Sequence, residues 1–164
     1  MVQNPCALSV TTVDFHFNTS DRLLHACRLV RKAFHSGKVS EEKPLLVFCA
    51  DAPRLRRFDD LLYEFSEADF IPHIDADHPL AEESPVLLCQ THYTPQLPRT
   101  PFVLINLDDE VPEFFSRFDR VFEIVGPDED DKQKARLRYA FYKSRGYAIT
   151  QHDLSTANSH QPSP

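Results

Sequence analysis

Residues 45–51 read LLVFCAD and are the clearest indication of the fold class. Its first six residues form an unbroken apolar run of strand length, which is the pattern of a strand covered on both faces. Strands of parallel sheets are buried in this way, so the run predicts a parallel sheet. Asp51 can then cap a helix that has Pro53 in its first turn. The apolar side of that helix recurs at three- and four-residue steps, at Leu55, Phe58, Leu61, Leu62 and Phe65.

Strands and helices alternate on both sides of this stretch. Before it, residues 13–17 alternate apolar and polar side chains as a strand does, and a helix capped by Ser20 or Asp21 ends at Gly37. After it, apolar runs predict strands at 86–89, 102–107 and 121–125, with a short helix at 111–118. This order predicts an α/β fold, a three-layer sandwich with a mostly parallel sheet and helices on both faces.

The last helix begins in four acidic residues, 128–131, and runs to about Arg145, where Gly146 closes it. Acidic side chains at a helix start interact favourably with the helix dipole. Residues 150–164 are rich in Ser, Thr, Asn, Gln and Pro, so we expect them to be disordered. The predicted organisation is an N-terminal extension (1–12), a single α/β domain (13–149) and a disordered tail (150–164).

Composition excludes several classes of function. The 164 residues include 18 Lys and Arg against 25 Asp and Glu, a net charge of −7, so strong direct DNA binding across the whole surface is not expected. The three glycines stand apart, so no glycine-rich phosphate-binding loop can be written. No apolar run approaches the length of a membrane span, and we expect no membrane contact.

The four cysteines contain no C-x-x-C pair: Cys6, Cys27, Cys49 and Cys89. We expect them to be reduced and structural, as in a cytoplasmic protein. The first ten residues lack the basic and apolar regions of a secretory signal, in agreement with a cytoplasmic location.

Residues 73–78 read HIDADH and place two imidazoles and two carboxylates within six positions. These side chains bind zinc or exchange protons, so the segment supports an alternative hypothesis, a small metal-dependent α/β hydrolase or nuclease. Flanking Pro72 and Pro79 instead favour a solvated loop. His92, which follows a predicted strand, is open to the same two interpretations. We assign no catalytic residue, no metal and no cofactor.

The last helix carries a cationic stripe. Lys132, Arg136, Tyr139 and Lys143 fall on one face at 3.6 residues per turn. Leu137, Phe141 and Ser144 lie nearly opposite, and we expect them to pack on the sheet. The cations either complement the helix dipole or bind an acidic peptide, in particular a free carboxylate that an Arg fork can grip.

A second surface candidate is the aromatic stretch 61–73, LLYEFSEADFIPH. Its large apolar residues are too irregularly spaced for all of them to face one core. Either Phe65 and Ile71 are buried while Tyr63 and Phe70 cover the sheet edge, or the exposed aromatics form a protein interface.

Several of these segments together resemble one family. They are the strand VDFHF, the step HSGK, the junction LLVFCAD, the phrase LLYEFSEADFIPH, the strand FVLINL with FDRVFEIV after it, and the closing helix KARLRYAFYKSRGY. Over roughly residues 13–149 the chain resembles the chi subunit of bacterial DNA polymerase III. The resemblance implies a non-catalytic accessory of the clamp-loader complex in DNA replication, one that binds the psi subunit and the acidic C-terminal tail of single-stranded-DNA-binding protein.

The resemblance also implies site residues. The tail site falls on Arg136 as the main carboxylate-binding residue, with Lys132, Tyr139 and Lys143 around it. The psi interface falls on Tyr63, Phe70 and Pro72, and the family suggests a repair helicase as a further partner on that surface. A third hypothesis is direct single-stranded DNA binding through the last helix, which would need stacking aromatics that only Tyr139 and Tyr142 offer.

Overall fold

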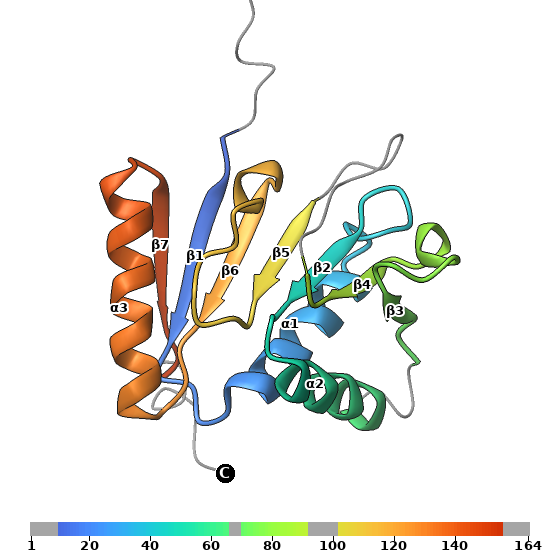
Figure 1. Ribbon diagram of the computed structural model, residues 1–164, viewed down its shortest axis with the longest axis horizontal. Helices are drawn as coiled ribbons and strands as arrows, with labels where there is room; N and C mark the ends of the chain where they lie inside the picture. Colours follow the sequence, from blue (N-terminus) through green and yellow to red (C-terminus); the bar gives the residue numbers. More distant parts are fainter. Residues whose placement is uncertain (1–9, 66–69, 92–101, 156–164) are drawn as a thin grey trace, which may run out of the picture.

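The computed structural model describes residues 10–65, 70–91 and 102–155. The strands are β1 (Thr12–Phe17), β2 (Leu45–Phe48), β3 (His73–Asp75), β4 (Val86–Cys89), β5 (Val103–Asn106), β6 (Arg120–Ile124) and β7 (Ala148–Asp153). The helices are α1 (Arg22–His35), α2 (Ala52–Phe65) and α3 (Glu129–Ser144), with 3₁₀ turns η2 (Ala81–Glu83) and η3 (Phe115–Arg117). Within these ranges the strands form one sheet in the order β3-β4-β2-β5-β6-β1-β7, and every pairing is parallel (Figure 1).

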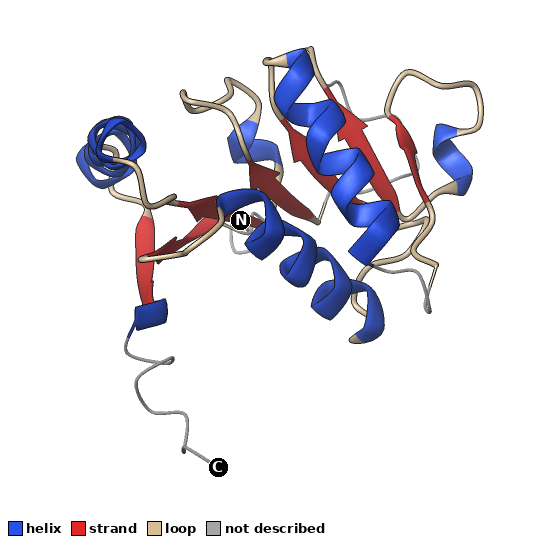
Figure 2. Ribbon diagram, turned by 90° about the horizontal axis from the view of Figure 1, so that it is seen from below, coloured by secondary structure: helices blue, strands red, loops and turns tan. Residues whose placement is uncertain are grey.

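Helices cover both faces of the sheet, so the predicted three-layer α/β sandwich is confirmed. One buried cluster joins α1 and α2 to the sheet, and a second cluster joins α3 and the two 3₁₀ turns to the opposite face. In Figures 1 and 2, α3 lies at the β7 end of the sheet, apart from α1 and α2.

The helix boundaries follow the predicted caps. The Asp21 carboxylate accepts a hydrogen bond from the Leu24 N–H at 3.0 Å, and Asp51 accepts one from the Arg54 N–H at 3.1 Å. These bonds satisfy N–H groups that a helix start otherwise leaves without partners. Gly37 and Gly146 follow α1 and α3 with φ values of 78° and 80°, a left-handed conformation that glycine adopts without strain.

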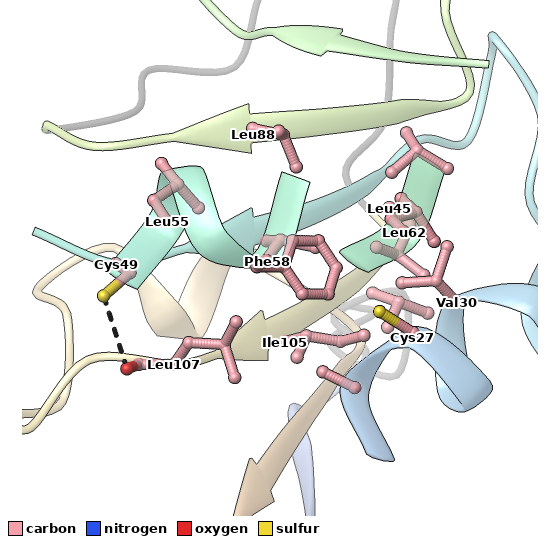
Figure 3. Close-up of a cluster of buried hydrophobic side chains, with 14 of the residues drawn as sticks. Cys27, Val30, Leu45, Cys49, Leu55, Phe58, Leu62, Leu88, Ile105 and Leu107 are labelled. Atoms are coloured by element: carbon pink, nitrogen blue, oxygen red, sulfur yellow. Dashed lines mark hydrogen bonds between the residues drawn. The ribbon is translucent and has the colours of Figure 1, made fainter. Parts of the chain in front are cut away.

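The larger core lies between the sheet and helices α1 and α2 (Figure 3). Phe58 of α2 is fully buried there, among apolar side chains from α1 and from strands β2, β4 and β5. Cys27, Cys49 and Cys89 are buried free thiols, as predicted for reduced structural cysteines. Burial raises the pKa of Cys27 to about 12 and that of Cys89 to about 11. The Cys49 thiol donates to the Leu107 carbonyl at 3.4 Å. Protonated thiols of this kind pack as small apolar groups.

The second core is aromatic. Tyr142 of α3 meets Phe15 and Phe115 edge to face, with ring centroids 6.0 and 5.3 Å away. Edge-to-face pairs add about 0.5–1.5 kcal/mol to the energy of burial. This cluster fixes the C-terminal part of α3 against strand β1 and turn η3.

Strand β7 corrects the prediction that residues from 150 onward are disordered. Residues 148–153 pair in register with residues 12–17 of β1, from Thr12 opposite Ala148 to Phe17 opposite Asp153. The sequence AITQHD gives little apolar signal because β7 is an edge strand with one hydrogen-bonded neighbour. The predicted domain boundary at 149 therefore falls inside a strand.

Two smaller elements also differ from the prediction. The segment beginning at His73 was expected to be an irregular loop, yet residues 73–75 pair with β4 as strand β3, which is too short to show a periodicity. The helix expected at 111–118 is limited to the 3₁₀ turn η3, whose Phe115 is buried. Predictions for Cys6, residues 1–9, His92 and residues 156–164 lie outside the described residues. None of the helices in the described ranges combines the length and apolarity needed to cross a bilayer.

A cluster of histidines lies where β1, β7 and α1 meet. His25 Nε2 is 3.0 Å from His16 Nδ1, and the His16 ring stacks on His152 with centroids 4.5 Å apart. Asp14 lies beside the cluster, 3.3 Å from His152 Nε2. Burial, followed by the neighbouring imidazoles, lowers the pKa of His16 from 6.5 to about 4. His16 is therefore neutral in the folded protein at neutral pH.

This cluster predicts a loss of stability in weak acid. Between pH 6.5 and about 4 the unfolded chain protonates His16 and the folded chain does not. The free energy of unfolding should therefore decrease as the pH is lowered from 6.5 to about 4, by on the order of 1 kcal/mol per pH unit. Urea titrations at pH 7 and pH 5 measure the difference, and His16→Gln should reduce it. An identical pH dependence in the wild type and the variant would contradict this assignment.

Candidate functional site

The side of α3 that packs against the sheet is not the side that carries Leu137 and Phe141. Its buried residues are Ala135, Arg138 and Tyr142. Leu137 is 73% exposed, Ser144 is exposed, and Phe141 is half-buried. The expectation that Leu137, Phe141 and Ser144 form the packing face is therefore wrong.

The reason lies in a buried carboxylate on strand β6. Glu123 is fully buried, and Arg138 Nε donates a hydrogen bond to its Oε1 at 2.7 Å. Its Oε2 accepts from the Tyr142 hydroxyl at 2.7 Å and from Asn106 Nδ2 at 2.9 Å. The Arg138 guanidinium also donates to the Asp109 carbonyl at 3.0 Å. The buried charge is thus paired and hydrogen-bonded on both oxygens.

This network determines the rotation of α3. A buried carboxylate without a charged partner is strongly destabilising, so Arg138 and Tyr142 must point inward together. They are four residues apart and therefore lie on one side of a helix. A rotation that buried Leu137 would withdraw both partners from Glu123, and it does not occur.

The predicted cationic stripe lies along the outer side of α3. It consists of Lys132, Arg136, Tyr139 and Lys143. Arg136 is 68% exposed at its side chain, and Lys143 is also exposed, whereas Lys132 is half-buried. The Arg136 guanidinium lies 3.6 Å from Glu129, whose side chain is equally exposed. Ion pairs between two exposed side chains contribute little, so Arg136 can exchange this partner for another anion.

Tyr139 ties the stripe to the edge of the sheet. Its half-buried ring meets Phe15 edge to face at 5.3 Å, and its hydroxyl accepts a hydrogen bond from Gln151 Nε2 at 2.9 Å. Gln151 belongs to β7, so the stripe borders the seam between α3 and the edge strand. Sequence reasoning missed Gln151 because it missed β7. The sequence did contain one indication of β7. The last helix ends at Gly146, and the segment after it could have been interpreted as a further parallel strand.

The stripe can bind a carboxylate chemically. An Arg fork donates two parallel hydrogen bonds to a carboxylate, and such charge-assisted bonds are about twice as strong as neutral ones. Lys132 and Lys143, one turn or more on either side of Arg136, add positive charge. The Tyr139 ring adds apolar area beside them. That these four residues bind a ligand remains a prediction.

The aromatic stretch presents two exposed rings near the β3 end of the sheet. Tyr63 is 66% exposed and Phe70 is 64% exposed, and Pro72 is half-buried. Ile71 is fully buried, as one interpretation of the sequence expected. Exposed large aromatics are typical of protein interfaces, so the geometry favours the interface interpretation for Tyr63 and Phe70.

The histidine-rich segment has internal partners. His73 Nδ1 lies 2.7 Å from the Ile71 carbonyl and His73 Nε2 lies 2.8 Å from Asp59 Oδ1, so the imidazole connects β3 to α2. His78 Nδ1 accepts a hydrogen bond from the Leu80 N–H at 3.0 Å. Among the described residues, no group of three or more His, Cys, Asp or Glu side chains is arranged to hold a metal ion. The contacts give His73 a structural role.

Comparison with known proteins identifies one family. Residues 10–150 match the family model described as DNA polymerase III chi subunit, HolC. A chi subunit from Pseudomonas aeruginosa is 35% identical over 149 residues, which cover 88% of this chain and 98% of that protein. A chi subunit from Haemophilus influenzae is 27% identical, with 81% and 84% covered. The Escherichia coli chi subunit is 26% identical, with 75% and 79% covered.

The Glu123 network predicts unequal effects of two neighbouring arginines on stability. Arg138→Ala should lower the free energy of unfolding by about 3–5 kcal/mol, because it leaves a buried carboxylate without its charged partner. Arg136→Ala should change it by less than about 0.5 kcal/mol, as expected for an exposed side chain. Urea denaturation followed by circular dichroism measures both values.

If Arg138→Ala does not fold, Tyr142→Phe provides the same test. It removes one hydrogen bond to Glu123 and should cost about 1–3 kcal/mol. Equal stability of the wild type, Tyr142→Phe and Arg136→Ala would contradict the network. Because substitution of Arg138 should destabilise the fold, Arg138→Ala is not a suitable control in binding experiments on α3.

Proposed function

Because the chain belongs to the DNA polymerase III chi subunit family, we propose that it is a non-catalytic adaptor of that polymerase. One surface binds the psi subunit. The other binds the acidic C-terminal tail of single-stranded-DNA-binding protein. The adaptor in this way links the clamp loader to single-stranded DNA that is coated by the single-stranded-DNA-binding protein.

The observation that carries the tail proposal is the exposed guanidinium of Arg136 on a helix of fixed rotation. Arg138 and Tyr142 hold α3 against Glu123, so the helix keeps Arg136 on its solvent side, and only the exposed ion pair with Glu129 has to be exchanged. A preorganised binding group loses less entropy when its ligand arrives. The Arg136 fork takes the terminal carboxylate, Lys132 and Lys143 face acidic side chains of the tail, and Tyr139 contacts an apolar one.

The psi proposal depends on the exposed rings of Tyr63 and Phe70 and on the half-buried Pro72, which together we call the aromatic patch. Phe70 lies 6.3 Å from the His73 ring, and His73 is bonded to Asp59 of α2. This contact places the Phe70 ring against the side chain that connects β3 to α2. Exposed aromatic side chains supply the anchors that dominate binding energy in protein interfaces.

The two proposed surfaces lie at opposite edges of the sheet. The aromatic patch adjoins β3 and the cationic stripe adjoins β7, which are the first and last strands in the sheet order (Figure 1). Seven strands spaced by about 4.8 Å separate the edges by roughly 30 Å. Both partners can therefore bind at once, which the linking function requires.

Direct binding of single-stranded DNA by α3 has less support. That hypothesis needs several rings for base stacking along a basic groove. Tyr142 is fully buried and bonded to Glu123, and Tyr139 is half-buried against Phe15. The metal-dependent hydrolase hypothesis is likewise unsupported, because His73 and His78 already have partners within the fold.

We expect Arg136→Ala to weaken binding of the tail peptide at least tenfold. Charge-assisted hydrogen bonds contribute about 1.5–3 kcal/mol, and 1.4 kcal/mol is a factor of ten in affinity. Arg57→Ala, an exposed arginine on α2, is the matched control and should bind as the wild type does. Calorimetric titration with the acidic tail peptide, at low and high salt, gives the affinities.

The same peptide without its terminal residue tests the role of the carboxylate. Wild type should bind it much more weakly than the complete peptide, and both affinities should fall with added salt. Equal affinity for the two peptides, or normal binding by Arg136→Ala, would overturn the tail proposal.

Psi binding should depend on the aromatic patch alone. Tyr63→Ala or Phe70→Ala should weaken psi binding by about 2 kcal/mol or more, because each removes an aromatic anchor. Leu137→Ala removes an equally exposed apolar side chain from α3 and should leave psi binding unchanged. Pull-down with psi, combined with tail-peptide titration of each variant, separates the surfaces. Equal loss of both activities in Tyr63→Ala would argue against two independent sites.

A further inference from the structure

Helix α1 carries a second concentration of positive charge that the proposed function does not use. From residue 22 to residue 40 the chain has five Lys and Arg and no Asp or Glu. The whole protein has a net charge of −7, so the remainder of the chain is more acidic still. A positive segment of this length in an acidic protein is a local feature that needs its own explanation.

The exposed cations of α1 surround an open hollow of about 690 Å³. Its lining residues are Arg28, Arg31, Lys32, His35 and Ser36 of α1 and its cap, with Phe65 from the end of α2. The guanidinium of Arg31 lies over the Phe65 ring, 5.5 Å from its centre. The Phe65 ring contributes apolar area to the lining of the hollow, and the α1 side chains contribute its positive charge.

The helix dipole accounts for only part of this charge. Cations stabilise a helix only in its last turn, which contains Lys32 and His35. Arg28 lies a full turn earlier and is exposed. Within the described residues, neither Arg28 nor Lys32 forms an ion pair with an acidic side chain. Two exposed like charges at i and i+4 destabilise a helix slightly, so a ligand of opposite charge would stabilise the arrangement.

The surface is separate from the stripe on α3. Helices α1 and α2 pack on one face of the sheet, and α3 packs on the other. Figure 2 shows α3 apart from the other two helices. A ligand in the α1 hollow would therefore leave the α3 seam free.

The chemistry of the hollow favours a short acidic peptide over a nucleic acid. Single-stranded DNA needs several free rings for stacking, and the one ring here is already covered by Arg31. A long polyanion would also meet the acidic remainder of the surface, whereas a short segment meets only the local charge. Arg28 and Lys32 are one helical turn apart. This spacing suits a bound peptide whose two carboxylates lie on successive turns of a helix or at alternate positions of a strand.

We propose that the hollow between α1 and the last turn of α2 is a docking site for a short segment, rich in Asp and Glu, of a protein partner. Arg28 and Lys32 bind its carboxylates, and the Arg31–Phe65 pair contacts its aliphatic carbons. The proposal is independent of the α3 site, because no residue is shared between them.

The test uses an octaglutamate peptide that is acetylated and amidated, so that it has no terminal carboxylate. The double variant Arg28→Gln/Lys32→Gln should lose at least tenfold in affinity, measured by calorimetry in low salt. Arg56→Gln/Arg57→Gln makes the same change of charge at exposed positions of α2 and should retain wild-type affinity. Binding of the tail peptide should be unaffected by either double variant.

Three results would overturn the proposal. One is equal octaglutamate affinity in Arg28→Gln/Lys32→Gln and the wild type. Another is an equal loss in the two double variants, which indicates an effect of net charge alone. The third is tighter binding of a fifteen-nucleotide oligothymidine than of octaglutamate, abolished by Arg28→Gln/Lys32→Gln, which would identify a nucleic-acid surface instead. Circular dichroism confirms that these exposed substitutions leave the fold intact.

Discussion

The buried carboxylate of Glu123 is the constraint on which the proposed tail site depends. A charge inside the protein must be paired, and the pairing groups come from α3, as Arg138 and Tyr142, and from β5, as Asn106. These bonds leave one rotation of α3. Since Arg136 is two residues from Arg138, it lies about 200° around the helix and faces solvent. The chemistry of a buried group thereby decides which cations of the helix are available to a ligand.

The sequence predicted the parts of the fold in which apolar periodicity and burial coincide. Helix α2 has Phe58 and Leu62 buried at the predicted spacing, and its start at Asp51 is capped as expected. For α3 the apolar pattern was misleading, because Leu137 was expected in the core and is exposed, whereas Arg138 is buried. A single sequence does not reveal that Glu123, in the otherwise apolar run 121–125, needs a cation brought inward. A polar residue inside a predicted buried strand was the one signal that pointed to it.

Strand β7 was not predicted, for a different reason. Without β7 the prediction also lacked Gln151, which lies beside the cationic stripe. An edge strand is half solvated, so its residues carry no apolar alternation and resemble a loop. The stripe residues themselves were predicted from helical spacing alone, which any rotation of the helix preserves. Their surroundings depend on tertiary structure: Tyr139 is held by Phe15 and Gln151, and Lys132 is half-buried. Spacing thus identifies the residues that share one face of a helix, while only tertiary packing determines which of them are exposed to solvent.

The proposed function requires that the acidic tail binds along the seam between α3 and β7, around Arg136. Amide chemical-shift mapping of the ¹⁵N-labelled chain during titration with the tail peptide tests this most directly, since it locates the ligand without substitutions. We expect the largest shifts on residues 132–143 and 148–153, with α1 and α2 little changed. Shifts concentrated on α1 and α2, or no saturable shifts on α3, would contradict it.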